Sequence, residues 1–339
     1  MMNVKAADAT DKRGERFTWR WIVLITLAVI LVAALIGSLA FGATPIDLSR
    51  ILEILGGDRS GTSGPIIWNI RFPRNLVGAL VGANLAVAGA ILQAVMKNPL
   101  ADPGIVGVSS GAGLAGVVML VLFPHLTYLV TPIAFLGAMG SALFVYALAW
   151  KNGIRPLRII LAGVAVNAFL GSGISALLIF YGDRVQGALL WMVGGLSARS
   201  WPQVEILVPY TILGVLIAFA GAKQLNILSL GDETARSLGM RVERVRFFMT
   251  GVAALLAAAA VSISGLIGFV GLVVPHMVRL LIGSDHRFLL PGSVLGGAAV
   301  MVLSDTLGRV AFAPIEVPVG IIMAFLGAPF FLYLLRRGE

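Results

Sequence analysis

Cysteine is missing from this 339-residue sequence, and lysine and histidine are scarce, with five and three copies. Without cysteine the chain can form no disulfide, thiolate metal site or cysteine nucleophile. A Walker A phosphate loop needs a Lys followed by Ser or Thr, whereas the five lysines are followed by Ala, Arg, Asn, Asn and Gln. The three histidines, His125, His276 and His286, form neither an HExxH motif nor a ligand cluster. The sequence therefore offers no recognisable site of its own for ATP or for a catalytic metal.

Charged residues are also few, at 12% of the chain, while hydrophobic residues reach 58% and the mean hydropathy is +0.97. Soluble domains carry about 25% charged residues. A soluble fold could not hide so much apolar surface, so much of it must face lipid. The composition predicts an all-α integral membrane protein in contact with membrane lipid.

The net charge of +9 does not indicate a nucleic-acid partner. No basic stripe with interleaved aromatic residues appears in the sequence, and basic residues gather in the cytoplasmic loops of membrane proteins. We therefore expect no nucleic-acid binding.

Ten apolar segments are candidate membrane helices. The first resembles a signal peptide, but it exceeds the ~7–15 residues of such an apolar region, and we interpret it as an uncleaved span. The predicted organisation is a cytoplasmic tail at 1–20 followed by a single transmembrane domain at 21–337. The ten segments are Trp21–Gly42, Leu76–Val95, Ile105–Phe123, Leu129–Trp150, Leu157–Tyr181, Val204–Ala222, Phe247–Phe269, Val270–Gly283, Pro291–Phe312 and Pro318–Leu335.

The eighth segment is too short to cross the ~30 Å of hydrocarbon in an upright position. We expect a partly re-entrant helix there, because broken helices are tolerated where protein or a cavity surrounds them. Chain bends are predicted at Gly265, Gly268, Gly271 and Pro275.

Lysine and arginine are distributed unequally over the two sides that ten spans create. With the N-terminus placed in the cytoplasm, 18 of the 25 Lys and Arg residues lie inside. Cytoplasmic loops carry an excess of Lys and Arg, so both termini are predicted to be cytoplasmic. The seven on the outer side are Arg50, Arg59, Arg71, Arg74, Arg184, Arg199 and Arg309.

The longest hydrophilic cytoplasmic segment is 223–246, KQLNILSLGDETARSLGMRVERVR. Two short helices are expected in it, Gly231–Leu238 and Val242–Arg246, with a break at Gly239. The acidic Asp232 stands at the N-terminus of the first, where negative charge favours the helix dipole. The segment is either an ordinary solvated loop or a rigid helical knob that docks into a partner protein.

Carboxylates at membrane depth are nearly absent, and Asp305 is the clear candidate. A proton-coupled transporter usually carries more such groups. Together with the missing Walker A loop, this pattern is typical of a conduit whose energy comes from another protein.

Six stretches of the sequence match one known family and cover nearly the whole chain in family order. They are IRFPRNLVGALVGANLAVAGAILQAVMKNPLADPGIVGVSSGAG (Ile70–Gly113), IILAGVAVN (Ile159–Asn167), WMVGGLSARSW (Trp191–Trp201), LNILSLGDETARSLGM (Leu225–Met240), GLIGFVGLVVPHMVRLLIGSDHRFLLPGSVLGG (Gly265–Gly297) and SDTLGRVAFAPIEVPVGIIMAFLGAPFFLYLL (Ser304–Leu335). Together they resemble the FecCD-type permease subunits of bacterial ATP-binding-cassette (ABC) importers for ferric siderophores, haem and cobalamin.

The resemblance implies the type II ABC importer permease architecture, with about ten transmembrane helices per subunit, in the bacterial cytoplasmic (inner) membrane. It also implies a dimer with a second copy or a homologous sister permease, two ATPase subunits and an extracytoplasmic substrate-binding protein. This chain then needs no bound cofactor, because the partner ATPase uses ATP and magnesium. It catalyses no bond chemistry itself.

The resemblance also assigns roles to particular residues. It makes the loop after the sixth helix the element that couples to the ATPase, which here comprises Gly231, Asp232, Glu233, Ala235, Arg236, Leu238, Gly239 and Met240. It matches three outer arginines to those that dock the binding protein, namely Arg71, Arg74 and Arg309. It places the cytoplasmic constriction at Asn98, Pro99 and Leu100, and we expect Asn84, Gln93 and Asn167 to be polar positions along the pathway or hydrogen bonds between helices.

The sequence thus predicts a permease subunit of an ABC importer that conducts an iron–siderophore-type metal chelate inward. One alternative is a cobalamin or haem permease of the same fold. The other is a stand-alone secondary transporter, which the scarcity of membrane carboxylates and the presence of segment 223–246 disfavour.

Overall fold

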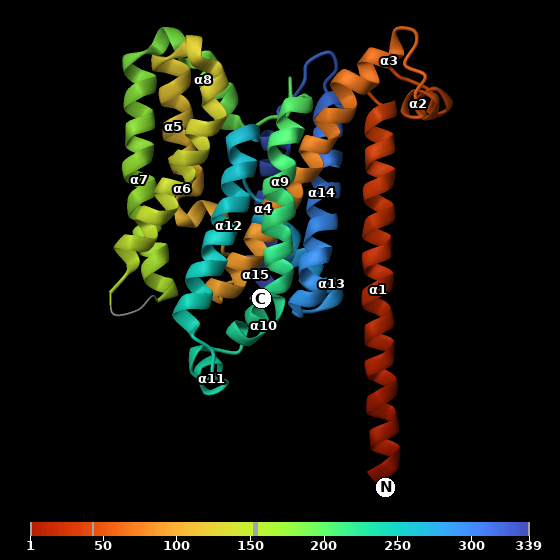
Figure 1. The fold of residues 1–339 in the computed structure, drawn as a ribbon, viewed down its shortest axis with the longest axis vertical. Helices are drawn as coiled ribbons and strands as arrows, with labels where there is room; N and C mark the ends of the chain where they lie inside the picture. The colour runs from red at the N-terminus through yellow and green to blue at the C-terminus, as the bar shows by residue number, and fades with distance from the viewer. Residues whose placement is uncertain (1, 43, 152–154, 338–339) are drawn as a thin grey trace.

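The computed structural model describes residues 2–42, 44–151 and 155–337, without the side chains of 2–16, 334, 335 and 337, and every regular element in these ranges is a helix (Figure 1). The helices are α1 (Met2–Ala40), α2 (Leu48–Leu55), α3 (Ser63–Pro65), the π-helix η1 (Ile66–Arg71), α4 (Phe72–Met96), the 3-10 helix η2 (Pro103–Val106), α5 (Val108–Leu122), the 3-10 helix η3 (Pro124–Leu129), α6 (Val130–Ala149), α7 (Pro156–Phe180), the 3-10 helix η4 (Gly182–Arg184), α8 (Val185–Val193), α9 (Trp201–Ala220), α10 (Ala222–Ser229), α11 (Asp232–Ser237), α12 (Val242–Ser264), α13 (Val270–Ile282), α14 (His286–Val310) and α15 (Val319–Arg337). The predicted all-α membrane fold is confirmed.

Ten apolar helices correspond to the ten predicted segments. Within the described residues, seven are long and apolar enough to cross a membrane, and three are shorter, at Val108–Leu122, Val270–Ile282 and Val319–Tyr333. The shortness of the eighth segment was predicted, but that of the third was not. The third segment forms the shorter helix α5, because Gly107, at φ +83°, separates η2 from α5 within the predicted span.

Helix α4 is the central element of the bundle, and α9, α12, α13 and α14 pack around it (Figure 1). Glycine makes two of these contacts close. A Cβ on Gly82 would lie 2.1 Å from the carbonyl oxygen of Gly297 in α14, and one on Gly89 would lie 1.8 Å from that of Gly271 in α13. In a membrane, where lipid competes equally for apolar side chains, such close backbone approach stabilises helix packing.

The chain reverses between α12 and α13 in the non-helical segment 265–269. Gly265 has φ +74° and Phe269 has φ +67°. The prediction of a bend at Gly265 was therefore right. Gly268 also lies in this non-helical segment, although without a positive φ, whereas Gly271 and Pro275 lie inside α13.

Proline at position 275 is tolerated inside α13 because a neighbouring side chain replaces its missing hydrogen bond. A proline has no N–H, so the carbonyl four residues earlier is left without its helical partner. Here that carbonyl belongs to Gly271, and the Gln93 Nε2 amide of α4 donates to it at 3.3 Å and to the Leu272 carbonyl at 3.2 Å.

Different helices lie at the two ends of the bundle. At one end, drawn lowest in Figure 1, lie α10, α11 and the start of α1. At the other lie α2, α3 and α8. We call these the Asp232 end and the Arg74 end, after a charged residue at each.

Candidate functional site

The predicted coupling segment forms two short helices at the Asp232 end, α10 and α11. Gly231, at φ +113°, leads into α11, and Gly239, at φ +80°, ends it. The Gly239 N–H donates to the Arg236 carbonyl (2.9 Å) and the Met240 N–H to the Ala235 carbonyl (3.0 Å), which is the bond pattern of a glycine-terminated helix. The predicted break is thus present at Gly239.

The second predicted helix of this segment is not separate. Val242–Arg246 forms the first turns of α12, which continues without a break to Ser264. Nothing in the local sequence stops the helix, since residues 242–246 contain neither glycine nor proline. Arg236 of α11 is tied to this helix by an ion pair with Glu243 at 2.7 Å.

Asp232 joins the coupling segment to two membrane helices. Its carboxylate accepts hydrogen bonds from Arg246 Nη2 at 2.9 and 3.2 Å and from the Lys97 ammonium at the end of α4. Partial burial opposes ionisation of Asp232, but the bonds from Lys97 and Arg246 outweigh it and hold its pKa below the usual value. The Arg246 side chain is fully buried, so the cluster is anchored in the bundle rather than free in solvent.

The predicted constriction follows Lys97 directly, in a turn that is closed by its own hydrogen bonds. Lys97 adopts a left-handed conformation at φ +50° and ends α4. The Asn98 side-chain oxygen accepts from the Leu100 N–H at 2.9 Å, and the Asn98 carbonyl accepts from the Ala101 N–H at 3.1 Å. Pro99 lies exposed at the tip. The Lys97–Asp232 pair thus connects α11 to the end of α4, where this turn begins.

The three predicted pathway amides have different environments. Gln93 is buried and also accepts from Arg279 Nη2 at 2.7 Å. Asn167 is half-buried, accepting from Ser110 Oγ at 2.6 Å and donating to the Gly104 carbonyl at 3.0 Å. Asn84 is fully buried, and neither of its side-chain atoms has a hydrogen-bond partner among the described residues. Gln93 and Asn167 thus bond between helices of this chain, and the pathway role of all three stays a prediction.

At the Arg74 end, the predicted docking arginines are buried and bonded within the chain. Arg74 forms two parallel hydrogen bonds with Asp305, at 2.9 and 3.0 Å, and a third with Glu316 at 2.9 Å. Asp305, the one clear membrane carboxylate in the sequence, is thereby paired with Arg74 and lies 3.3 Å from Arg309 Nε.

Arg71 and Arg309 also satisfy oxygens of this chain. Arg71 donates to the carbonyls of Leu39 and Thr44, each at 2.6 Å. Arg309 donates to the hydroxyl of Ser38 at 2.5 Å. Exposed fractions are only 5% for Arg71 and 7% for Arg74 and Arg309. These bonds anchor the end of α1 and the loop that follows it, and docking of a binding protein by the same arginines stays a prediction.

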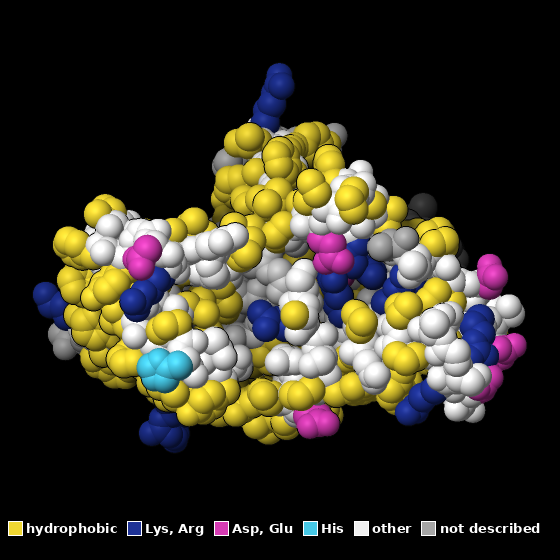
Figure 2. Space-filling model, turned by 90° about the horizontal axis from the view of Figure 1, so that it is seen from above, with side chains coloured by type: hydrophobic (Ala, Val, Ile, Leu, Met, Phe, Trp, Pro, Cys, Tyr) yellow, Lys and Arg dark blue, Asp and Glu magenta, His cyan; other side chains and the backbone are white. Residues whose placement is uncertain are grey.

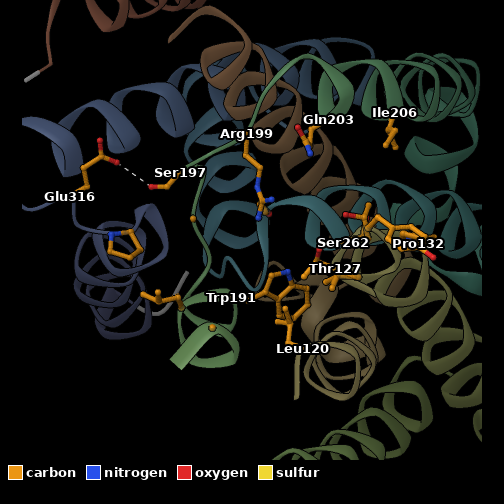
Figure 3. A pocket seen from close by; sticks show the side chains of 18 residues that line it. Leu120, Thr127, Pro132, Trp191, Ser197, Arg199, Gln203, Ile206, Ser262 and Glu316 are labelled. Atoms are coloured by element: carbon orange, nitrogen blue, oxygen red, sulfur yellow. Dashed lines mark hydrogen bonds between the residues drawn. The ribbon is translucent and has the colours of Figure 1, made fainter. Parts of the chain in front are cut away.

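The face of the Arg74 end carries basic and acidic side chains among hydrophobic ones, both near its middle and at its margins (Figure 2). A cavity of ≈ 630 Å³ opens there between η3, α6, α8 and α9, with Arg199, Trp191 and Glu316 among its lining residues (Figure 3). Ser197 donates to Glu316 at 3.1 Å across one side of it.

Arg199 and Glu316 were not predicted as site residues. The charge count placed Arg199 on this side, but nothing in the local sequence shows that it points into a cavity. Glu316 meets its partner Arg74 across 242 positions of sequence, a pairing that no spacing pattern could reveal.

Comparisons with known proteins agree with this architecture. A family model described as the FecCD transport family matches residues 29–337. The chain belongs to this family. The resemblance seen in the sequence is confirmed over nearly its full length.

Several relatives are named as permeases of import or transport systems. The chain is 47% identical over 279 residues to the cobalamin import system permease BtuC of Halobacterium salinarum, covering 82% of this chain and 75% of that protein. It is 39% identical to the Fe(3+)-citrate import system permease YfmD of Bacillus subtilis, covering 96% and 97%. It is 40% identical to the hemin transport system permease HmuU of Yersinia pestis, covering 93% and 96%.

A solved structure shares the fold. One chain of a metal-chelate type ABC transporter, in an inward-facing conformation, superposes with a TM-score of 0.84 at 29% identity, covering 93% of this chain and 99% of the other. The FecCD family member described here is therefore a membrane-embedded permease of the ABC importer type.

Proposed function

We propose that this permease moves a metal chelate of the iron–siderophore type into the cytoplasm, powered by ATP hydrolysis on separate subunits. The observation that supports this most directly is the Asp232 cluster. It connects a short helix that projects from the bundle to the turn at the end of the central helix α4. Such a link suits a conduit that is opened and closed by force from a partner.

The partner at the Asp232 end is proposed to be a pair of ABC ATPase subunits, which bind the ATP and magnesium that this chain does not use itself. Leu230 and Leu238 flank α11 with exposed fractions of 63% and 61%. Exposed leucines beside charged residues at the tip of a membrane protein fit a docking knob. In this proposal Asp232 and Lys97 transmit the ATPase movement to the turn at Asn98.

The places of the other proposed subunits depend on the orientation of this chain in the membrane. With both termini in the cytoplasm, the Arg74 end faces outward and receives an extracytoplasmic binding protein. Since Arg71, Arg74 and Arg309 are engaged by the chain, an incoming carboxylate would have to share or exchange their present partners. A second permease, identical or a sister chain, completes the pathway.

Three relatives named for different cargoes make cobalamin and haem the alternatives for the substrate. Uptake by cells lacking their own importers distinguishes them. We expect the complete system to accumulate a radiolabelled ferric siderophore, and not labelled cobalamin or haem, when the permease is present. Accumulation of cobalamin or haem alone would replace the iron proposal by that alternative.

The ATPase partnership is tested by gentle detergent purification of the tagged chain from its host. We expect a Walker A ATPase in the eluate and its loss with Leu238→Asp. Arg184→Gln is the matched control, because Arg184 lies exposed at the opposite end. A chain recovered without any ATPase, under conditions that keep a known importer intact, would favour a stand-alone transporter.

A further inference from the structure

Two cavities at the Arg74 end form one continuous groove. The larger, of ≈ 630 Å³, lies at the helix ends, and a second, of ≈ 460 Å³, follows the surface between α6 and α9 toward the middle of the bundle. The two share Tyr128, Thr131, Pro132, Ile206 and Ser262 as lining residues. We call the joined cavity the α6–α9 groove.

The upper part of the α6–α9 groove contains a cation without a partner. Arg199 extends from the loop before α9 into the cavity, toward Trp191 and Thr127 (Figure 3). Its Nε is buried without a hydrogen-bond partner, and its side chain forms no ion pair or hydrogen bond within the described residues. Burial lowers the pKa of Arg199, although a guanidinium stays charged at neutral pH. A half-buried, unpaired guanidinium favours an anion as its missing partner.

The nearby acid does not fill this role. Glu316 lines the same cavity, but its carboxylate accepts from Arg74 at 2.9 Å and from Ser197 at 3.1 Å. Arg74 itself already pairs with Asp305. The charge of Glu316 is therefore engaged, and Arg199 remains the uncompensated cation of the groove.

The lower part of the groove is apolar and lies on the outer surface of the helix bundle. The rings of Phe135 and Tyr210 form its wall, with centroids 5.4 Å apart. Leu136 and Ile206 are 62% and 45% exposed, although both are hydrophobic. On a membrane helix, side chains exposed in this way are available to lipid chains.

An aromatic cluster lies close to Arg199 in the chain. Trp201, two residues after Arg199, begins α9, and its indole donates to the Trp68 carbonyl at 3.0 Å. The rings of Trp68, Trp201 and Phe72 pack together with centroids within 5.7 Å of one another. Because tryptophan is enriched at the headgroup level of membranes, this cluster favours a position of Arg199 near the lipid phosphates.

We propose that the α6–α9 groove binds one membrane phospholipid, with its phosphate on Arg199 and an acyl chain between Phe135 and Ile206. The planar guanidinium suits a phosphate because it can form two parallel hydrogen bonds. The polar side chains of Gln203 and Thr127 stand beside it for the glycerol and headgroup oxygens. The site does not depend on the transported substrate or on the ATPase.

The test uses the full chain in nanodiscs that contain phosphatidylglycerol, with bound lipid counted by native mass spectrometry. We expect one retained phospholipid per chain and a loss of about tenfold in its retention with Arg199→Gln, as for a lost charged hydrogen bond. Arg184→Gln is the matched control, since Arg184 lies at the same end, outside the groove and 51% exposed. Arg199→Lys keeps the charge and should restore part of the binding.

A second variant tests the acyl half without changing a charge. Thr131 lines both cavities, and Thr131→Trp should fill their junction and displace the lipid while Arg199 remains. If Arg199→Gln does not fold, as judged by gel filtration, this variant alone decides the question.

Three results would overturn the proposal. Equal losses for the Arg199 and Arg184 variants would show general attraction of lipid to a basic surface. Binding of inorganic phosphate by wild-type protein with unchanged lipid retention in Thr131→Trp would show a free-anion site. Absence of any retained phospholipid in wild-type protein would show an empty groove.

Discussion

The spans that contain helices α4 and α7 have equally apolar windows and opposite surroundings. The most apolar windows of the spans that contain them, Ser63–Met96 and Pro156–Phe180, both score 1.9, yet 89% of the first is buried and only 17% of the second. Both helices have 25 residues. Hydropathy therefore shows that a helix lies in the membrane, but it does not show whether protein or lipid surrounds it.

The difference lies in what the side chains of each helix meet. Helix α4 carries buried alanine or glycine at positions 78, 82, 83, 86, 88, 89, 90 and 94, and neighbouring backbones approach it closely. Helix α7 instead presents large side chains outward, with Phe169, Ile179 and Phe180 between 76% and 79% exposed. Such a surface is available to lipid or to a second permease.

Glycine-to-alanine substitution should give the largest difference between the two helices. Gly89→Ala in α4 places a methyl group 1.8 Å from the Gly271 carbonyl, and we expect it to destabilise the fold by more than about 3 kcal/mol or to prevent folding. Gly171→Ala in α7 meets nothing within 4 Å and should be neutral. Thermal unfolding in detergent measures both, and equal effects would contradict the packing argument.

Truncation of a matched isoleucine in each helix should give an intermediate difference. Ile91 of α4 is fully buried, whereas Ile179 of α7 is 78% exposed. Ile91→Ala should lower the unfolding free energy by about 2–4 kcal/mol because it leaves a cavity. Ile179→Ala should change it by less than about 0.5 kcal/mol. A large effect at Ile179, measured in the isolated chain, would show that α7 packs more tightly than its exposure indicates.

Changes at the ends of the two helices should give the smallest difference in folding stability, and this difference should depend on pH. Helix α4 is tied to Asp232 through Lys97, whereas among the described residues the first turn of α7 has no ion pair, and its Arg158 side chain donates to the Lys151 carbonyl at 2.6 Å. Since the pKa of Asp232 is lowered in the folded state, its contribution to stability is present above the unfolded pKa, near pH 4. It is lost as the pH falls through the folded value.

Asp232→Asn should therefore lower stability at pH 7 by about 1 kcal/mol or less, as for other partly exposed ion pairs. It should also flatten the decline of stability with acid. Melting temperatures from pH 7 to pH 3 measure this, with the exposed Asp183→Asn as the control. An unchanged pH profile in Asp232→Asn would remove the Asp232 cluster from our account of coupling.

The glycine break at Gly239 and the short eighth span were predictable because both depend on local chemistry. Glycine favours the left-handed conformation that ends a helix, and a helix of 13 residues is simply too short to cross. The prediction of a separate helix at Val242–Arg246 was wrong, because these residues form the start of α12. The charges of the stretch suggested a helix boundary, although it contains no residue that would end a helix.

Other contacts join residues that are far apart in the chain. The sequence predicted seven arginines on one side of the membrane, but not that Arg74 and Arg309 converge on Asp305 while Arg199 has no partner among the described residues. Likewise, the sequence marked Gln93 as a polar residue in an apolar helix. Only packing against α13 shows that it satisfies the carbonyl freed by Pro275.

The sequence by itself determined the membrane environment, the number of apolar helices and the family, because hydropathy, charge distribution and motifs are all local in the chain. The tertiary structure alone decided which apolar faces meet protein, which charges are neutralised and where a cavity remains. These properties depend on close packing between distant segments, and packing is set by the fit of side chains in three dimensions rather than by their order.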